Sequence, residues 1–256
     1  MSKAHILLFV LSLGVVSTLA RAADTPTASP APVLVELFTS EGCSSCPPAD
    51  RLLQELESKQ PISGAQIIVL SEHVDYWNSL GWKDPYSSRF FSDRQSAYGN
   101  HFDLATVYTP QMIVDGEAQF SGSNAREAQQ SIAKASAETK IPVQISSVVA
   151  QSGTLKAHVE TGPGSGVVYV AVALSHAESQ VLRGENGGHR LSHVAVVQSL
   201  QQIGDLRKEK DFAKDIELKI PQGDDPANLR VIAFIQEIHD NAPGKILGSA
   251  LAFPGK

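Results

Sequence analysis

The two cysteines of the chain, Cys43 and Cys46, are three positions apart in the segment GCSSCPP at residues 42–48. An apolar run at residues 33–38 precedes this segment and an amphipathic stretch at residues 49–59 follows it, so we predict a buried strand, a turn and a helix. A thiol at a helix N-terminus faces unpaired backbone N–H groups and the positive end of the helix dipole, which favour the thiolate. This placement predicts that Cys43 is an exposed nucleophile and that Cys46 is the resolving thiol about one turn further in.

Two other interpretations of the cysteine pair remain open. The pair could form a disulfide with a purely structural role, or it could supply half of a metal site. The C-x-x-C spacing alone is compatible with all three kinds of site, so the position in the fold and the neighbouring residues must decide between them.

The composition indicates a globular chain with a hydrophobic core. Of the 256 residues, 42% are hydrophobic and 19% are charged, which excludes a disordered or collagen-like chain. Asp and Glu number 27 against 21 Lys and Arg, the formal net charge is −6, and no dense run of basic residues is present. We therefore predict no nucleic-acid partner, because binding to nucleic acid depends on neutralising phosphates.

Residues 1–22 have the pattern of a secretory signal peptide. Residues 6–20 are an apolar run, and Ala20 and Ala22 supply the small residues that precede a cleavage site. Because this run is shorter than the roughly 20 residues of a membrane span, we predict cleavage after Ala22 and no stable membrane span. Residues 23–32 are expected to form an extended tether. The mature protein is thus predicted to be exported, and periplasmic if its source is a bacterium with two membranes.

The pattern of residues 33–139 indicates an α/β domain in which strands alternate with helices. The pair Asp115-Gly116 favours a hairpin, because it tolerates the positive φ angles of a type I′ turn. The expected order is strand, helix, strand, helix, two hairpin strands and a closing helix. The strands are predicted at residues 33–38, 66–71, 112–114 and 118–120, and the helices at residues 49–59, 85–100 and 124–137.

Residues 140–256 follow a different pattern, in which short β-rich runs are separated by Gly, Asn, Asp or Pro turns. This pattern is typical of a small β-sandwich, so we predict a second, all-β domain. Its strands are predicted at residues 143–150, 154–160, 167–174, 194–200, 216–220 and 229–235.

The cysteine segment and a downstream proline together resemble the thioredoxin fold. The proline is Pro110, in the segment YTPQM at residues 108–112, and it opens the predicted hairpin. The resemblance implies that the Thr109–Pro110 bond is cis, that Pro110 packs against the disulfide, and that the backbone of Thr109 pairs with an incoming substrate strand. Tyr108, beside it, is a further candidate for substrate binding.

Longer motifs resemble an uncharacterised family of exported thioredoxin-like proteins that carry a domain of unknown function. The similarity covers nearly the whole mature chain, and it implies a thioredoxin-like fold and cysteine geometry without an established reaction. The matching segments are ELFTSEGCSSCPPAD at residues 36–50, HVDYW at 73–77, LGW at 80–82, YTPQM at 108–112, and GENGG at 184–188 with His193.

Three further residues are candidates for the site. Glu36 is the one acid in the first predicted strand, and the resemblance implies a buried acid that moves the proton of the resolving thiol; alternatively, it reaches solvent or caps a backbone group. His73 and Trp77 follow the second predicted strand, at the sheet edge where ligands gather, and are predicted to bind substrate. Alternatively, the aromatic residues there pack an insertion against the sheet. His189 and His193 lie in a turn-to-strand region where their spacing does not converge, so no metal site is predicted.

These observations lead to three candidate functions. The first is an exported thiol–disulfide oxidoreductase that exchanges disulfides with protein thiols or disulfides through Cys43 and Cys46, without a dissociable cofactor. The second is a protein that handles copper or another soft metal with both cysteines and a histidine such as His73. The third is a binding module whose disulfide is only structural. Neither the oligomeric state nor the direction of electron flow is predicted.

Overall fold

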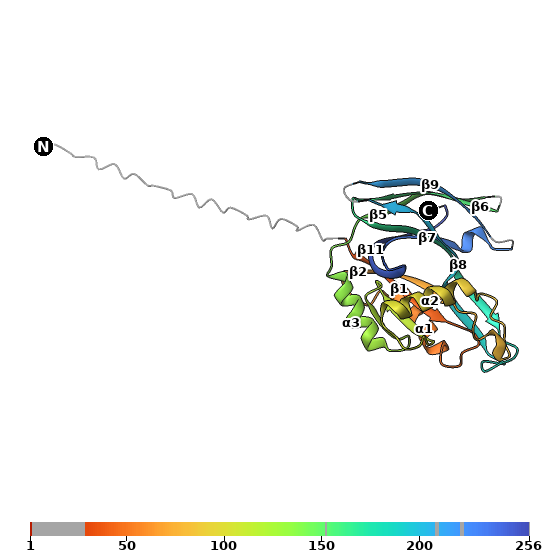
Figure 1. Cartoon of the computed structure of the whole chain (residues 1–256). Coiled ribbons are helices and arrows are strands. Elements are labelled where there is room, and N and C mark those ends of the chain that lie inside the picture. Colours follow the sequence, from red (N-terminus) through yellow and green to blue (C-terminus); the bar gives the residue numbers. More distant parts are fainter. Residues whose placement is uncertain (2–28, 152, 208–209, 221–222, 256) are drawn as a thin grey trace.

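The computed structural model describes residues 1, 29–151, 153–207, 210–220 and 223–255 (Figure 1). The predicted signal peptide after Met1, and the predicted tether as far as residue 28, lie outside the described residues. Within the described residues, no helix is both long enough and apolar enough to cross a membrane.

The described strands form two sheets. The elements in chain order are β1 (Ala31–Thr39), α1 (Pro47–Lys59), β2 (Ala65–His73), η1 (Asn78–Leu80), α2 (Arg89–His101), β3 (Gln111–Val114), β4 (Ala118–Ser121), α3 (Ala125–Ser136), β5 (Val143–Gln151), β6 (Thr154–Thr161), β7 (Gly166–Gln180), β8 (Arg190–Leu206), β9 (Phe212–Lys219), η2 (Pro226–Asn228), β10 (Leu229–His239) and β11 (Ala242–Ala252). The larger sheet has eight strands in the order β11-β10-β7-β8-β2-β1-β3-β4, and the smaller sheet has three in the order β5-β6-β9.

The elements from β1 to α3 occur in the order that the sequence predicts. β1 pairs with parallel β2 and antiparallel β3, and β3 pairs with antiparallel β4. Side chains of β1 alternate between the two faces of the sheet. Val33, Val35 and Leu37 pack with α1 and α3. Leu34 packs with Phe91 of α2 on the opposite face, so helices cover β1 on both sides.

The second half of the chain continues the same sheet. β8 lies beside β2, with Ser71 and Val196 paired in parallel, and β7, β10 and β11 follow in antiparallel pairs. The sheet thus passes across the predicted boundary at residue 140, and the division into two domains stays a prediction. The three-stranded sheet faces β7, β8 and β10 over an aliphatic core that includes Leu155 and Val170 (Figure 1).

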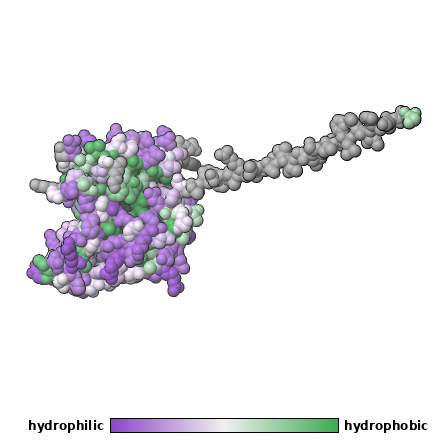
Figure 2. Space-filling view, turned by 180° about the vertical axis from the view of Figure 1, so that it is seen from behind, coloured by the Kyte–Doolittle hydropathy of each residue, from purple (hydrophilic) through white to green (hydrophobic). Residues whose placement is uncertain are grey.

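The layers can be followed in the views of the whole molecule. The three-stranded sheet lies at the top of Figure 1, and the three α-helices lie around the lower part of the larger sheet. Seen from behind, hydrophobic residues show mainly in the upper half of the molecule, at the level of the two facing sheets, while the lower half is largely hydrophilic (Figure 2). The turn that carries the cysteines lies in the lower half, next to α1.

The Asp115-Gly116 turn ties the β3–β4 hairpin to two other strands. Asp115 and Gly116 have φ angles of 48° and 68°, as predicted for this turn. The Asp115 carboxylate accepts a hydrogen bond from the Leu34 backbone N–H at 2.7 Å and pairs with Lys140 Nζ at 2.7 Å. The Asp115 carbonyl oxygen accepts the backbone N–H of Ile246 in β11 at 2.8 Å.

Gly116→Ala should therefore destabilise the protein more than the matched substitution Gly64→Ala. Both glycines have positive φ angles, which cost a residue with a Cβ about 1–2 kcal/mol. A Cβ on Gly116 would also overlap the carbonyl oxygen of Gly244, whereas a Cβ on Gly64 would meet no atom within 4 Å. In urea denaturation we expect Gly116→Ala to lose about 2 kcal/mol more unfolding free energy than Gly64→Ala. Equal losses would contradict the close approach of the hairpin and β11.

Candidate functional site

Cys43 and Cys46 form a disulfide in the turn between β1 and α1, here called the cysteine turn (residues 40–46). Their Cα atoms are 5.4 Å apart. Cys46 is the N-cap residue of α1, and its carbonyl oxygen accepts the backbone N–H groups of Ala49 and Asp50 at 2.8 and 3.1 Å. A proline follows at the first helical position, where no N–H donor is needed. The predicted placement of strand, turn and helix is therefore confirmed.

The disulfide is buried. Cys43 and Cys46 are both 0% exposed, and only Ser44 and Ser45 of the turn between them reach the solvent. The prediction that Cys43 is exposed is therefore wrong. Trp77 packs on the turn so closely that a Cβ on Gly42 would lie 3.0 Å from the Trp77 Cβ atom.

A second cover comes from the β7–β8 loop (residues 181–189), which lies far along the chain. The Asn186 side-chain amide donates hydrogen bonds to the carbonyl oxygens of Glu41 at 2.8 Å and Cys43 at 3.0 Å. The Glu185 carboxylate accepts the Ser44 backbone N–H at 3.0 Å. Neither residue was predicted to belong to the site, and their only signal in the sequence was the GENGG motif.

Three predicted substrate-binding residues, Tyr108, Thr109 and Trp77, lie close together. The Trp77 indole N–H donates to the Thr109 hydroxyl at 2.8 Å, and the Gln95 amide donates to the Tyr108 carbonyl oxygen at 2.8 Å. The Thr109–Pro110 bond is cis, as predicted, and Pro110 is buried. The contact between Pro110 and the disulfide, like the substrate-binding role of the three residues, stays a prediction.

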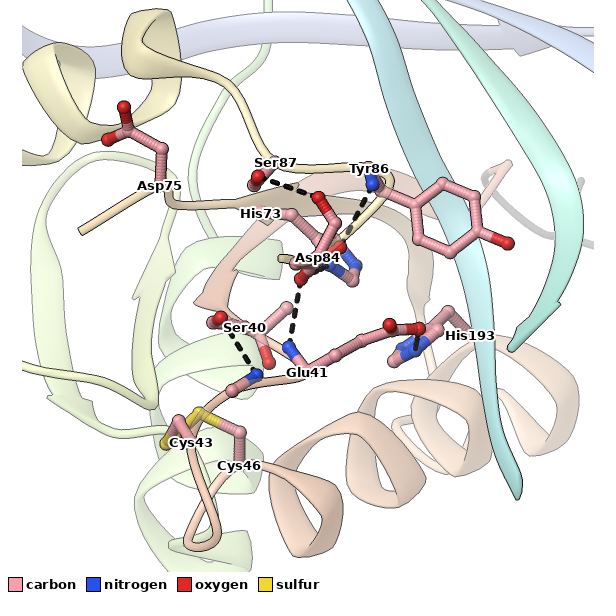
Figure 3. Close-up of polar contacts among 12 residues, drawn as sticks. Ser40, Glu41, Cys43, Cys46, His73, Asp75, Asp84, Tyr86, Ser87 and His193 are labelled. Atoms are coloured by element: carbon pink, nitrogen blue, oxygen red, sulfur yellow. Dashed lines mark hydrogen bonds and ion pairs between the residues drawn. A yellow bond between two sulfur atoms is a disulfide. The ribbon is translucent and has the colours of Figure 1, made fainter. Parts of the chain in front are cut away.

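His73 belongs to a buried cluster, which consists of Glu41, His73, Asp84 and His193, rather than to an open surface. Its side chain is 0% exposed, and its Nδ1 atom lies 2.7 Å from Asp84 Oδ2, which also accepts the Glu41 backbone N–H at 2.8 Å. Burial raises the pKa of Asp84, but the charge of His73 and three hydrogen bonds to the carboxylate outweigh it and lower that pKa below its ordinary value. Figure 3 shows how this cluster adjoins the cysteine turn through Ser40 and Glu41.

His193 of β8 completes the buried cluster. Its Nε2 atom lies 3.3 Å from Glu41 Oε1, and its Nδ1 atom lies 3.8 Å from Asp50 Oδ1, an ion-pair distance too long for a hydrogen bond. The ring stands edge-on to His73, with centroids 4.7 Å apart. Burial lowers the pKa of His193, but Asp50 and Glu41 outweigh it and raise the pKa to about 10. In the sequence, the only signal for this histidine was its place in a family motif.

Glu36 is buried at 1% exposure, but its partners come from α2. Arg94 binds Glu36 Oε1 through Nε at 2.8 Å and Nη2 at 2.5 Å, and the Tyr98 hydroxyl donates to Oε2 at 2.5 Å. Glu72 of β2 lies near the same guanidinium, and burial together with the charge of Glu36 raises the pKa of Glu72 well above its ordinary value. Among the contacts of the described residues, none links Glu36 to a cysteine, so its role as proton carrier stays a prediction.

His193→Gln tests the charge arrangement of the buried cluster. The pKa of folded His193 lies above its ordinary value of about 6.5, so the stabilisation from its charge is fully present below that pH and is lost as pH rises through about 10. We expect the difference in unfolding free energy between wild type and variant to be largest at about pH 6 and to shrink toward about pH 10. Urea titrations across this range measure it. The exposed His176→Gln should give a small difference at every pH, and a pH-independent loss in His193→Gln would contradict the assignment.

Comparison with solved structures finds one that is similar over most of its length. A crystal structure of a protein from Agrobacterium tumefaciens, determined as a structural-genomics target, is 27% identical, with a TM-score of 0.67 over 88% of this chain and 94% of that chain. A sporulation control protein from Bacillus subtilis is 10% identical, with a TM-score of 0.28 over 45% of this chain and 47% of that chain. A domain of an outer membrane lipoprotein from Porphyromonas gingivalis is 13% identical, with a TM-score of 0.27 over 45% of this chain and 88% of that chain. The last two similarities are too low to support an argument.

The family comparison covers most of the chain. Among curated protein sequences, none is significantly similar. Residues 34–236, which include the cysteine turn, the buried cluster and the β7–β8 loop, match the family described as "Protein of unknown function (DUF1223)". The chain therefore belongs to the DUF1223 family.

Proposed function

We propose that this protein is an exported thiol–disulfide oxidoreductase that acts on protein thiols or disulfides through Cys43 and Cys46. The observation that carries the proposal is the Cys43–Cys46 disulfide at the N-terminus of α1. Backbone N–H groups and the helix dipole at such a position stabilise a thiolate, the form that performs exchange. Export rests on the predicted signal peptide, which lies outside the described residues.

We also propose that the unit from β1 to α3 is thioredoxin-like. Support comes from the strand order β4-β3-β1-β2, with β1 and β2 parallel and β3 antiparallel to β1. Helices cover both faces of this unit. The pair Thr109-Pro110 stands directly before β3, and Trp77 bonds to it from the loop after β2. The cysteine turn and the proposed substrate-docking residues thus come from neighbouring connections of one sheet.

The proposed exchange balances without a cofactor. In the reduced protein, the Cys43 thiolate attacks one sulfur of a partner disulfide, and the other partner sulfur leaves as a thiolate that takes a proton from solvent. The Cys46 thiolate, having released its own proton, then attacks the Cys43 sulfur and expels the second partner thiolate. The partner gains two electrons and the cysteine pair loses two, returning to the disulfide; the reverse sequence oxidises a partner dithiol.

One observation favours the alternative of a binding module with a structural disulfide. Both cysteines are fully buried, whereas attack on a disulfide requires access to one of its sulfur atoms. The copper alternative has less support. Its candidate ligand His73 bonds to Asp84, and in the described part of the chain no three His, Cys, Asp or Glu side chains are grouped to hold a metal ion.

The reduction potential of the cysteine pair separates the two main functions. We expect a value between about −120 and −270 mV, measured by alkylation and mass shift after equilibration in thiol buffers. In thiol buffers poised within this range of potentials, Cys46→Ala should form a lasting mixed disulfide with oxidised glutathione, because no resolving thiol remains. The control Cys43→Ala/Cys46→Ala should form none. A potential below about −300 mV would mean that the bridge is structural and would reject the oxidoreductase.

A further inference from the structure

The peptide unit between Cys43 and Ser44 has both of its polar groups occupied by the β7–β8 loop. The Cys43 carbonyl oxygen accepts the Asn186 amide at 3.0 Å, and the Ser44 N–H donates to the Glu185 carboxylate at 3.0 Å. These are side-chain contacts from residues more than 140 positions away. The β7–β8 loop therefore binds the one exposed segment of the cysteine turn. It occupies backbone groups of that segment to which a polypeptide partner could otherwise form hydrogen bonds.

Contacts away from the cysteine turn also hold the β7–β8 loop in place. Its ends are joined by backbone bonds between Val181 and His189 and between Gly188 and Val181, at 2.9 and 2.8 Å. Gly184 packs against Gly81, whose Cβ, if present, would lie 3.3 Å from the Gly184 Cα atom. The position of Glu185 and Asn186 over the cysteine turn is thus set by the fold, and it does not depend on those two side chains alone.

Glu185 binds the backbone N–H that follows Cys43 directly in the chain. Backbone N–H groups beside a reactive cysteine stabilise its thiolate, and the Ser44 N–H is the nearest of these along the chain. Glu185 accepts the hydrogen bond of this donor and adds a negative charge nearby. Both effects disfavour the thiolate form of Cys43. The hydrogen bonds from Ser44 in turn lower the pKa of Glu185, which keeps it ionised.

We propose that Glu185 and Asn186 are positioning residues that hold the cysteine turn in a closed form of low reactivity. An extended polypeptide partner engages Cys43 by taking over the carbonyl oxygen of Cys43 and the N–H of Ser44. This proposal rests on the proposed function and names the class of partner, a polypeptide segment that offers its own backbone N–H and C=O groups.

Glu185 is the charged neighbour best suited to a test. Glu41, Asp50 and His193 are buried, and His193 pairs with both carboxylates, so their removal would disturb the fold. Asp84 is also buried and accepts the Glu41 backbone N–H. Glu185 is exposed. Glu185→Gln keeps an oxygen that can accept the Ser44 N–H and removes only the charge, whereas Glu185→Ala also frees the N–H.

The experiment measures the alkylation rate of Cys43 by iodoacetamide between pH 5 and pH 10, in a Cys46→Ala background where Cys43 is the only thiol. We expect Glu185→Gln to shift the midpoint of the pH–rate profile to lower pH and to raise the rate at neutral pH by about three- to tenfold, since one pKa unit changes the thiolate fraction up to tenfold. Glu185→Ala should raise it at least as much. Glu160→Gln, an exposed acid of β6, is the matched control and should change neither quantity.

The outcomes distinguish this proposal from the proposed function. If Glu185→Gln and Glu185→Ala match Glu160→Gln in rate and midpoint, Glu185 does not control Cys43, and the closed-form proposal is wrong even where the measured potential supports exchange. If excess dithiothreitol fails to reduce the disulfide in folded wild type and in Glu185→Ala alike, the oxidoreductase and the closed form both fail. Asn186→Ala should raise the alkylation rate without moving the midpoint, because it removes a neutral contact.

Discussion

The pairing of β8 with β2 is the interaction on which the cysteine site depends. β8 follows directly on the β7–β8 loop, so its place beside β2 brings that loop to the cysteine turn. α1 strengthens the connection, because the Gln54 amide donates to the Ser192 carbonyl oxygen at 2.5 Å and Glu57 forms an ion pair with Arg230 of β10. Pairing strands so far apart in sequence costs loop-closure entropy, which the burial of the common apolar faces offsets.

Buried charge is a second constraint on how the elements assemble. Glu36 pairs with Arg94, Asp115 with Lys140 and Glu41 with His193, and all six side chains are 8% exposed or less. Such pairs add little net stability, but removing one partner leaves the other as an uncompensated buried charge. Each pair also joins two different parts of the fold. If a strand or helix shifted its position, the two charges of such a pair would therefore separate while both remained buried, out of contact with water.

Local sequence patterns, together with a family resemblance, were enough to predict the local structure. The strand, turn and helix around Cys43, the hairpin at Asp115 and the cis bond before Pro110 depend on residues close in sequence or on a family resemblance. The burial of Cys43 and the contacts of Glu185 and His193 could not be predicted, because they depend on residues far apart in sequence. Glu185 lies 141 positions from Ser44, and His193 lies 152 positions from Glu41. The turn residues of the second half indicated six of its seven described strands and missed β11 (Ala242–Ala252). They did not indicate that β7, β8, β10 and β11 extend the first sheet. The thioredoxin-like classification itself stays a proposal.

The position of β2 inside the large sheet limits how this chain can be divided. β2 is an interior strand only because β8 lies on its outer side. If the chain were cut after α3, β2 would become a sheet edge, and Ile68 and Leu70 would lose apolar neighbours such as Ala173 and Val197. An apolar edge with unpaired backbone groups is a template for association between chains. We therefore expect a fragment that ends after α3 to associate through β2, whereas a chain that keeps both halves covers that edge with β8.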